Sequence, residues 1–264
     1  MATRDVACRV LGVECHPLPY YTISLETPPD FPEVAPGQFV MALADPGRDP
    51  YLRRAFSVFD VSRAEGLPRL ELLGKVIGRG TSRLAARRVG DNVHVLGPLG
   101  RGFRLEGAGR AALVAGGVGS AALLLLARAL HAAGSAFDVL YGGRRADDLA
   151  CADRFADLAS GAGGELVAVT EDGSRGRRGL VTEALEDGLA ASRWHSVFTC
   201  GPTPMMARVA ALATRHGVPG QAALETPMGC GYGACLGCAV PHRDGRFALC
   251  CQDGPVFDFD EVSW

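Results

Sequence analysis

The feature that most restricts the fold is a regular alternation of apolar strand-like segments and helical segments over residues 107–221. Short apolar runs such as "AALVAG", "FDVLYGG" and "SVFTC" alternate with longer runs of helical period such as "LVTEALEDGLAA". Strands joined by helical crossovers are parallel, and their continuous apolar character indicates burial on both faces. We therefore expect a doubly wound parallel sheet with helices on both faces, and a ligand site at the carboxyl ends of its strands.

The two flanking regions follow other patterns. Residues 1–106 contain short β-rich runs such as "QFVMALA" and "RLELLGKVI", divided by Gly, Pro and Asp and interrupted by one helical segment, "TSRLAARRV". This spacing predicts a small antiparallel β barrel. Residues 222–264 have no helical period and hold five of the nine cysteines. We expect three parts: a barrel at 1–106, an α/β domain at 107–221 and a small module at 222–264.

Charge and hydropathy exclude several classes of partner. The net charge of -2 and pI of about 6.3 provide no basic surface for nucleic acid or for an anionic membrane. The most apolar stretch, "SAALLLLARAL", is broken by Arg128 well short of the roughly 20 residues that cross a bilayer. The N-terminus lacks the apolar region of a signal peptide, so we expect a cytoplasmic protein with reduced thiols. Its nine cysteines then favour metal or redox chemistry over disulfides.

The sequence "MGCGYGACLGC" contains three cysteines among four glycines. Cys230, Cys235 and Cys238 are separated by four and two residues, and a fourth cysteine follows at 250 or 251. This spacing is typical of a plant-type 2Fe-2S cluster. Several thiolates must converge on one small cluster, so the glycines are expected to remove obstructing Cβ atoms and let backbone N–H groups approach the sulfurs. They are Gly229, Gly231, Gly233 and Gly237.

A four-cysteine zinc site is the alternative. Zinc ligands usually come as two close pairs, whereas here the fourth ligand is isolated and the loop is richer in glycine than zinc requires. The pattern therefore favours iron–sulfur. Cys250 and Cys251 compete for the fourth position, and adjacent residues of an extended segment point to opposite sides, so only one is expected to ligate.

Two segments of the barrel region indicate a flavin. "RRAFSV" places Arg54 and Phe56 on one strand face and Ser57 on the other, an arrangement that can hold a pyrophosphate, a ring and a polar ring atom. The pattern is common and is weak alone. Gly80 and Thr81 lie at the start of the helical segment, where free N–H groups and the helix dipole suit a pyrophosphate.

Two turns of the α/β domain indicate a pyridine nucleotide. "AGGVGS", with Gly116, Gly117 and Gly119, opens the first β/α unit but lacks the third glycine of G-x-G-x-x-G. Cys200-Gly201-Pro202 ends the last strand before a helix and is otherwise a plain tight turn. Glu171 and Asp172 would repel a 2'-phosphate and so predict NAD rather than NADP. The opposite preference would come from Arg144, Arg145, Arg175 and Arg177.

In this order, the motifs resemble the ferredoxin-NADP reductase superfamily. The segments "ETPMGCGYGACLGCAV" and "CCQDGPVF", with "TEDGSRGRRGLVTEAL" upstream, resemble the electron transfer subunit of type B dihydroorotate dehydrogenase over essentially the whole chain. The resemblance implies FAD, one 2Fe-2S cluster and NAD(H). It also implies an FMN-containing catalytic subunit as partner in a heterotetramer of two plus two, with electrons passing from dihydroorotate through FMN, the cluster and FAD to NAD in pyrimidine biosynthesis.

The same resemblance assigns residues. It selects Cys251 as the fourth cluster ligand beside Cys230, Cys235 and Cys238, and it places no substrate-converting residue in this chain. The implied FAD contacts are Arg54, Ala55, Phe56, Ser57, Leu73, Gly74, Lys75, Gly80 and Thr81, and the implied nucleotide contacts are Gly116, Gly117, Gly119, Cys200, Gly201 and Pro202. The chain departs from the family pattern at Ala55, Phe56, Ser120, Ala122 and Tyr232.

Some alternatives stay open at this stage. In one alternative, the chain is the reductase component of an oxygenase, a hydrogenase or a sulfite reductase. In another, it is a redox sensor. Cys200 and Glu225 lie near the ends of late strands and have either a structural role or one beside the nicotinamide and flavin. Tyr232, Leu236 and Phe257 either contact a partner subunit or pack beneath the cysteine loop.

Overall fold

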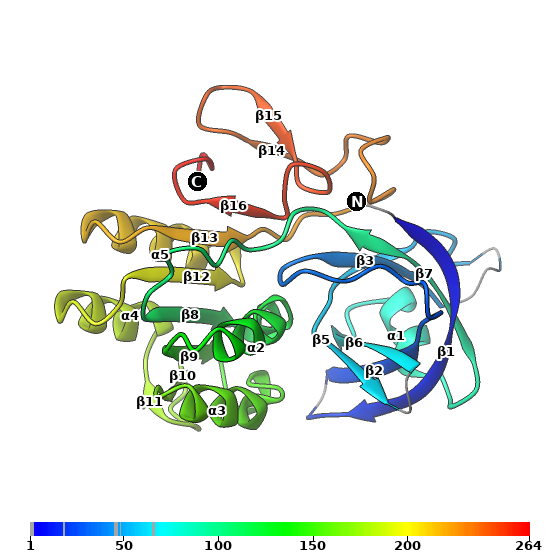
Figure 1. The fold of residues 1–264 in the computed structure, drawn as a ribbon, viewed down its shortest axis with the longest axis horizontal. Helices are drawn as coiled ribbons and strands as arrows, with labels where there is room; N and C mark the ends of the chain where they lie inside the picture. The colour runs from blue at the N-terminus through cyan, green and yellow to red at the C-terminus, as the bar shows by residue number, and fades with distance from the viewer. Residues whose placement is uncertain (1–2, 18, 45–46, 48, 65–66) are drawn as a thin grey trace.

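The computed structural model describes residues 3–17, 19–44, 47, 49–64 and 67–264. Two seven-stranded sheets lie side by side, and a two-stranded sheet near the C-terminus lies above them in Figure 1. The first sheet is built from the N-terminal region and the second from the β/α alternation. Among the described residues, no helix combines the length and the apolar character that crossing a membrane requires.

The N-terminal sheet is antiparallel throughout and curls into a half-barrel, as the short β-rich runs predict. Its strand order is β4-β3-β7-β1-β2-β6-β5, with helix α1 (Arg79–Ala85) across one end. The strands are β1 (Arg4–Cys15), β2 (Tyr20–Glu26), β3 (Phe39–Leu43), β4 (Arg54–Ser57), β5 (Asp60–Ala64), β6 (Leu67–Lys75) and β7 (Asn92–Leu99). Alternate residues of β2, such as Tyr21 and Ile23, fill the half-barrel core.

The second sheet is parallel except at one edge, in the order β11-β10-β9-β8-β12-β13-β16. Its strands are β8 (Ala111–Gly116), β9 (Phe137–Gly143), β10 (Leu166–Thr170), β11 (Arg177–Arg178), β12 (Ser196–Cys200), β13 (Gly220–Ala223) and β16 (Val256–Asp258). The edge strand β16 runs antiparallel to β13 and comes from the C-terminal region. The doubly wound sheet is thus extended by a strand that lies outside the β/α alternation, a common arrangement for an edge of such a sheet.

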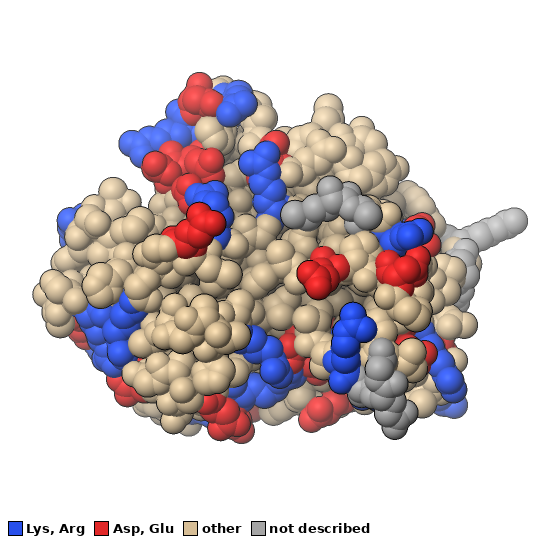
Figure 2. All heavy atoms as spheres, viewed as in Figure 1, with Lys and Arg blue, Asp and Glu red and all other residues tan. Residues whose placement is uncertain are grey.

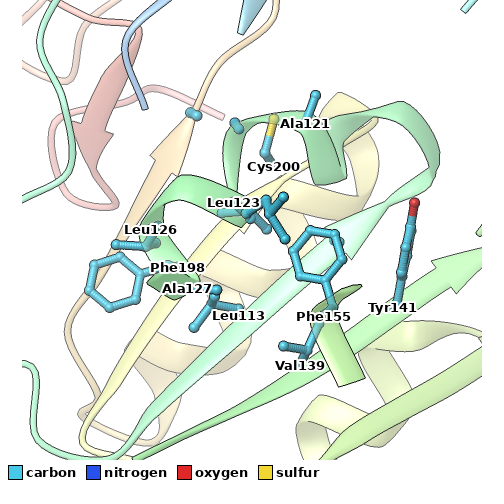
Figure 3. Close-up of a cluster of buried hydrophobic side chains, with 14 of the residues drawn as sticks. Leu113, Ala121, Leu123, Leu126, Ala127, Val139, Tyr141, Phe155, Phe198 and Cys200 are labelled. Carbon is cyan, nitrogen blue, oxygen red and sulfur yellow. The ribbon is translucent and has the colours of Figure 1, made fainter. Parts of the chain in front are cut away.

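Helices cover both faces of this sheet, as the buried strands require. They are η1 (Gly117–Ala122), α2 (Leu124–Ala132), η2 (Ala146–Asp148), α3 (Ala152–Gly161), α4 (Val181–Ala190) and α5 (Thr203–Arg215). Along β8, Leu113 packs toward α2 and α3, whereas Val114 packs toward α4 and α5. Figure 3 shows the first of these cores, in which Leu113 and Phe155 lie between the sheet and the helices.

The half-barrel and the α/β domain share part of this core. Tyr20, Phe59 and Leu73 of the half-barrel are buried in the same cluster as α2 and α3. In the other direction, Leu125 of α2 packs into the half-barrel core. The two domains therefore meet through apolar contact rather than through a solvated linker alone.

The C-terminal region crosses from one domain to the other. Residues 224–238 run from β13 over the half-barrel, and β14 (Ala239–Pro241) and β15 (Phe247–Leu249) form the small antiparallel sheet. The chain then returns to the α/β sheet as β16.

On the face shown in Figure 2, acidic and basic side chains lie beside one another. This surface agrees with the near-neutral net charge.

Candidate functional site

A cavity of about 560 Å³ opens at the carboxyl ends of the parallel strands. Of the residues that the sequence indicates for a nucleotide, Gly116, Gly117, Gly201 and Pro202 line it. They come from the ends of β8 and β12, which are hydrogen-bonded neighbours in the sheet. The position is the one expected for a ligand of a doubly wound sheet.

Two glycines here are required by close packing. A Cβ on Gly116 would lie 2.6 Å from Met205 Sδ, and one on Gly119 would lie 2.5 Å from the Cys200 carbonyl oxygen. Gly119 does not line the cavity; its role in the structure is to let the turn after β8 approach the end of β12. Ser120, which departs from the family pattern, accepts a 2.7 Å hydrogen bond from the Tyr141 hydroxyl and is buried.

Cys200 and Glu225 form a pair at the wall of this cavity. The Cys200 thiol is buried and donates toward Glu225 Oε1 at 3.8 Å, while Glu225 lines the cavity. Burial raises the pKa of Cys200, and the Glu225 charge raises it further. Glu225 is solvent-exposed at the cavity, but desolvation by the protein atoms around its carboxyl group raises its pKa, and the Cys200 hydrogen bond acts against this shift. Cys200 thus stays a neutral thiol beneath the cavity, and Gly201 and Pro202 form the surface above it.

The charged side chains around the cavity decide which nucleotide it suits. Glu171 lines it, whereas the Asp172 carboxylate accepts hydrogen bonds from the backbone N–H and the hydroxyl of Ser174, which lower its pKa. Arg144 also lines it. Arg175 pairs with Asp153 at 3.0 Å and Arg177 with Asp187 at 2.5 Å. Of the four arginines considered from the sequence, only Arg144 lines the cavity.

Several lining residues escaped the sequence analysis. Arg208 of α5 lines the cavity and pairs with Glu186 at 3.2 Å. Pro204 and Arg208 are four residues apart on one helical face, and this spacing after the Cys-Gly-Pro turn is the signal that could have identified them. Tyr20 could not be found this way, because it reaches the cavity from the half-barrel.

The half-barrel side of the cavity is formed by a cross-strand pair. Tyr20 of β2 is paired in register with Lys75 of β6, the one lysine of the sequence. The Tyr20 hydroxyl donates to Asp148 Oδ1 at 2.9 Å, and Lys75 Nζ lies 5.2 Å from the centre of the Tyr20 ring. Lys75, assigned to FAD by resemblance, therefore lies where the half-barrel borders the nucleotide cavity.

Arg54 and Gly80 are brought together beside helix α1. A Cβ on Gly80 would lie 2.6 Å from Arg54 Nε, so the glycine allows the guanidinium group to cross the helix start. The helix begins at Arg79, one residue before the expected position, with Gly78 as N-cap. Thr81 Oγ1 accepts a 3.0 Å hydrogen bond from the Ile77 N–H and donates to the Gly78 carbonyl. A guanidinium group beside free amides fits the pyrophosphate of a flavin dinucleotide.

Other residues assigned to FAD have side chains turned inward. Phe56 packs in the half-barrel core and Leu73 in the core shared by the two domains. A Cβ on Gly74 would lie 2.5 Å from Tyr21 Cζ, so this glycine is required by packing. Ala55 is exposed and Ser57 half-buried on the other face of β4. Any flavin contact from Phe56 or Leu73 must therefore use the backbone or a side-chain edge.

The cysteines of the C-terminal region form two pairs. Cys238 Sγ and Cys251 Sγ lie 3.2 Å apart and are buried, and Cys230 Sγ accepts a 3.4 Å hydrogen bond from the Cys235 N–H. Among the described residues, no group of three or more Cys, His, Asp or Glu side chains is arranged to hold a single metal ion. A 2Fe-2S cluster takes two thiolates on each iron, so two pairs fit it better than a single zinc ion.

The structure also separates the two adjacent cysteines. Cys251 faces Cys238, whereas the Cys250 thiol is buried and donates to the Leu224 carbonyl at 3.4 Å. The two residues lie in the turn that follows β15 rather than in the expected extended segment, and this turn directs their side chains to different partners. Cys251, whose thiol faces Cys238, is the residue that the resemblance selects.

The thiols differ in acidity. Burial acts to raise the pKa of Cys230, but hydrogen bonds from the backbone N–H groups of Tyr232 and Cys235 lower it to about 6. Burial, with the neighbouring Cys238, raises the pKa of Cys251 to about 12. At neutral pH these shifts favour the thiolate form of Cys230 and the neutral thiol of Cys251.

Two of the four loop glycines are required because neighbouring atoms leave no room for a Cβ. Gly231 (φ +82°) lies against Met41 and Gly233 (φ +86°) against Gln252, each too close for a Cβ. Gln252 Nε2 also donates to the Tyr232 carbonyl at 3.0 Å. A Cβ on Gly229 or Gly237 would be in ordinary contact with Cys235 Sγ, so packing within the chain does not by itself require these two glycines. Contact with Met41 of the half-barrel accounts for Gly231, and contact with Gln252 of the same C-terminal region accounts for Gly233.

The apolar residues near the loop divide into two groups. Tyr232 and Leu236 are 57% and 63% exposed, and Leu236 has an unusual positive φ of 59° for a residue with a side chain. Phe257 is 4% exposed and packs in the core on the α4 and α5 face of the sheet. Tyr232 and Leu236 remain available to a partner, and Phe257 is an internal residue.

A curled antiparallel half-barrel beside a nucleotide-binding α/β sheet, with paired cysteines in an appended loop, defines an oxidoreductase of the ferredoxin-NADP reductase class with an iron–sulfur module. Residues 113–211 match the model of the oxidoreductase NAD-binding domain. Residues 225–263 match that of the iron-sulfur cluster binding domain of dihydroorotate dehydrogenase B. The chain belongs to the family of dihydroorotate dehydrogenase B (NAD(+)) electron transfer subunits.

Relatives and solved structures agree with this assignment. The chain is 38% identical to the electron transfer subunit of Desulforamulus reducens, over 89% of this chain and 90% of the relative. It is 36% identical to an electron transfer subunit homolog of Aquifex aeolicus, over 92% of each. Among solved structures, a chain of an NADH-dependent reduced ferredoxin-NADP oxidoreductase, described for flavin-based electron bifurcation, matches with a TM-score of 0.85 and 32% identity. That match covers 97% of this chain and 90% of the other.

Proposed function

We propose that this chain carries electrons between NAD(H) and an FMN-containing dihydroorotate dehydrogenase subunit, through a 2Fe-2S cluster and FAD, in pyrimidine biosynthesis. The main support is one spatial relationship. The cysteine loop rests on the half-barrel, with Gly231 against Met41, while the same half-barrel borders the nucleotide cavity through Tyr20 and Lys75. A flavin bound to the half-barrel would thus lie between the nucleotide and the cluster.

The chemistry of the cofactors explains why this order is useful. A flavin exchanges a hydride with nicotinamide and single electrons with an iron–sulfur centre, which accepts only one. The residues of the chain supply binding and position. We assign the cluster to Cys230, Cys235, Cys238 and Cys251, and the nicotinamide end of NAD to the surface formed by Gly201 and Pro202 above Cys200.

The flavin is assigned to the half-barrel. Arg54 and the amides at Gly80 and Thr81 are proposed to hold its pyrophosphate, because the guanidinium group of Arg54 lies against the start of α1. Lys75 is proposed to contact the flavin at the edge of the cavity. Glu171 is proposed to disfavour a 2'-phosphate and so to select NAD.

The proposed partner is an FMN-containing catalytic subunit in an assembly of two plus two chains. Tyr232 and Leu236, exposed beside the cluster loop, are the proposed contacts. The proposed domains are the half-barrel at 1–106, the α/β domain at 107–221 and the cluster module at 222–264. We place the activity in the cytoplasm, where thiols stay reduced for cluster assembly.

An anaerobic absorption spectrum of the purified chain, with assays for iron, sulfide, zinc and flavin, tests the cofactors. Flavin and iron–sulfur bands that bleach on addition of NADH are expected. A colourless zinc-containing protein would contradict the cluster assignment. Co-purification with an FMN protein that forms orotate from dihydroorotate with NAD tests the pathway.

A second function is favoured by one comparison. The 32% identical chain belongs to an oxidoreductase that uses NADH, ferredoxin and NADP, so this chain is alternatively a subunit of an electron-bifurcating complex. The two functions differ in the partner. A partner that reduces NADP, and leaves dihydroorotate unchanged, would favour the second. The resemblance to a ferredoxin reductase of carbazole 1,9a-dioxygenase, at 22% identity, concerns the fold alone.

A further inference from the structure

An ionic network joins the half-barrel to the α/β domain away from the nucleotide cavity. Asp60, at the start of β5, is 4% exposed, and its Oδ2 lies 2.5 Å from Arg154 Nη2 and 2.8 Å from Arg128 Nη2. Arg154 Nη1 also donates to Glu71 Oε2 of β6 at 2.7 Å. The two carboxylates belong to the half-barrel, and the two arginines belong to α3 and α2.

The network is anchored close to the proposed cofactor-binding segments. Asp60 follows Ser57 by three residues, and Glu71 precedes Leu73 by two, so each lies beside a strand segment assigned to FAD. On the other side, α2 follows the glycine turn of the cavity, and α3 follows Asp148, which lines it. One guanidinium group therefore links β5 and β6, which adjoin the segments proposed to bind FAD, to the domain that contains the nucleotide cavity.

The geometry of the contact is directional. Arg154 uses two different nitrogens for two carboxylates, and its guanidinium carbon lies 4.7 Å from the centre of the Phe59 ring. The remaining oxygen of Asp60 accepts the Val61 N–H at 2.9 Å. Apolar packing between domains, such as that of Phe59 on Phe155, is non-directional. A fork of charge-assisted hydrogen bonds restricts the two domains to one arrangement.

We infer that Arg154, together with Arg128, is a positioning residue that sets the orientation of the flavin-bearing half-barrel relative to the nucleotide cavity. This inference rests on the proposed function, because it concerns hydride transfer between NADH and the flavin. The Asp60 carboxylate is buried and the two arginines are partly exposed, an arrangement that adds little net stability, so we assign the arginines to orientation. Hydride transfer is sensitive to position, since a displacement of about 1 Å costs roughly 100-fold in rate.

The chain contains a closely matched control. Arg193 binds the buried Asp138 at 3.0 Å and Glu165 at 2.6 Å, and its guanidinium carbon lies 5.6 Å from the Trp194 ring centre. It therefore has the same kinds of partner as Arg154: a buried aspartate, a glutamate and an aromatic ring. All of these partners belong to the α/β domain. Losing Arg193 disturbs that domain without disturbing the contact between the domains.

The test is single-turnover reduction of the flavin by saturating NADH in the FAD- and cluster-loaded protein. Arg154→Met and Arg128→Met are expected to lower the limiting rate by about 10- to 100-fold, with FAD content and NADH affinity within about twofold of wild type. Arg193→Met is expected to lower the thermal midpoint and to leave the rate within about twofold. Equal rates in all variants, or equal losses in Arg154→Met and Arg193→Met, would overturn the inference.

Two further measurements distinguish a failure of this inference from a failure of the proposed function. The rate losses of Asp60→Asn and Arg154→Met are expected to be less than additive in the double variant, because both single variants remove the Asp60–Arg154 contact; fully additive losses would contradict this. If NADH does not reduce the wild-type flavin, the proposed function fails. Amide hydrogen exchange then tests the inference independently. Faster exchange in β5 and α3 of Arg154→Met, but not of Arg193→Met, supports the link between domains, and unchanged exchange refutes it.

Discussion

The sulfur atoms of Cys238 and Cys251 lie 3.2 Å apart at the buried base of the cysteine loop, although twelve residues separate them in the chain. The hairpin of β14 and β15 brings them together, because the Cys250 N–H donates to the Cys238 carbonyl at 3.1 Å. The backbone contact leaves the side chain of Cys251, rather than that of Cys250, facing Cys238. The position of the fourth thiol is therefore a property of the hairpin register.

The two adjacent cysteines give the first prediction. Cys251→Ser is expected to abolish the stable cluster, whereas Cys250→Ser is expected to retain it and to lower stability by about 1 kcal/mol through the altered hydrogen bond to Leu224. Iron and sulfide content with the electron paramagnetic resonance signal of the reduced protein is the measurement. Full cluster content in Cys251→Ser, with loss in Cys250→Ser, would reverse the assignment.

The contact between the cysteine loop and the half-barrel gives the second. Gly231→Ala adds a Cβ against Met41 at a positive φ, so we expect a loss of about 2–4 kcal/mol in unfolding free energy together with lower cluster content. Gly245→Ala is the matched control, because its φ of +87° is similar and nothing lies within 4 Å. It is expected to cost about 1 kcal/mol and to leave cluster content unchanged. Thermal unfolding and iron assays compare the two, and equal effects would show that backbone strain alone matters.

The raised pKa of Glu225 gives a prediction about pH. The folded state holds this proton more tightly than the unfolded state, so stability declines as the pH rises from the usual value of 4.5 through the raised folded value. Glu225→Gln removes this loss. Its thermal midpoint is expected to equal that of wild type at low pH and to exceed it increasingly toward neutral pH. Parallel curves of thermal midpoint against pH for the two proteins would contradict the raised pKa.

The charge at the cavity wall gives the fourth prediction. Glu171→Gln is expected to raise kcat/KM for NADPH relative to NADH by roughly 5- to 10-fold, since removing one partly screened repulsion is worth about 1 kcal/mol. Asp172→Asn is the control and is expected to change this ratio less than twofold, because Asp172, whose carboxylate is held by Ser174, does not line the cavity. Flavin reduction by each nucleotide measures both ratios. Equal use of NADH and NADPH by the wild type would contradict the charge argument at the outset.

The sequence alone determined the features that depend on neighbours along the chain. The β/α alternation predicted the parallel sheet, because strands joined by helical crossovers run parallel and are buried on both faces, as β8 is along its whole length. The Cys230, Cys235 and Cys238 spacing predicted one loop that presents several thiols. The glycine turns predicted the ends of β8 and β12, where Gly117 and Gly201 line the cavity. Each of these inferences needed only a short window of sequence.

Only the tertiary structure decided the contacts between distant segments. Tyr20 and Asp148 are 128 residues apart, and Arg154 meets Asp60 across 94 residues. No local pattern marks such pairs, because they depend on how two separately formed sheets pack against each other. The same reason explains the burial of Phe257, whose strand returns to pair with β13. Local periodicity specified the two sheets and the cysteine loop, and long-range packing then determined which of their side chains face one another across the cavity and the domain boundary.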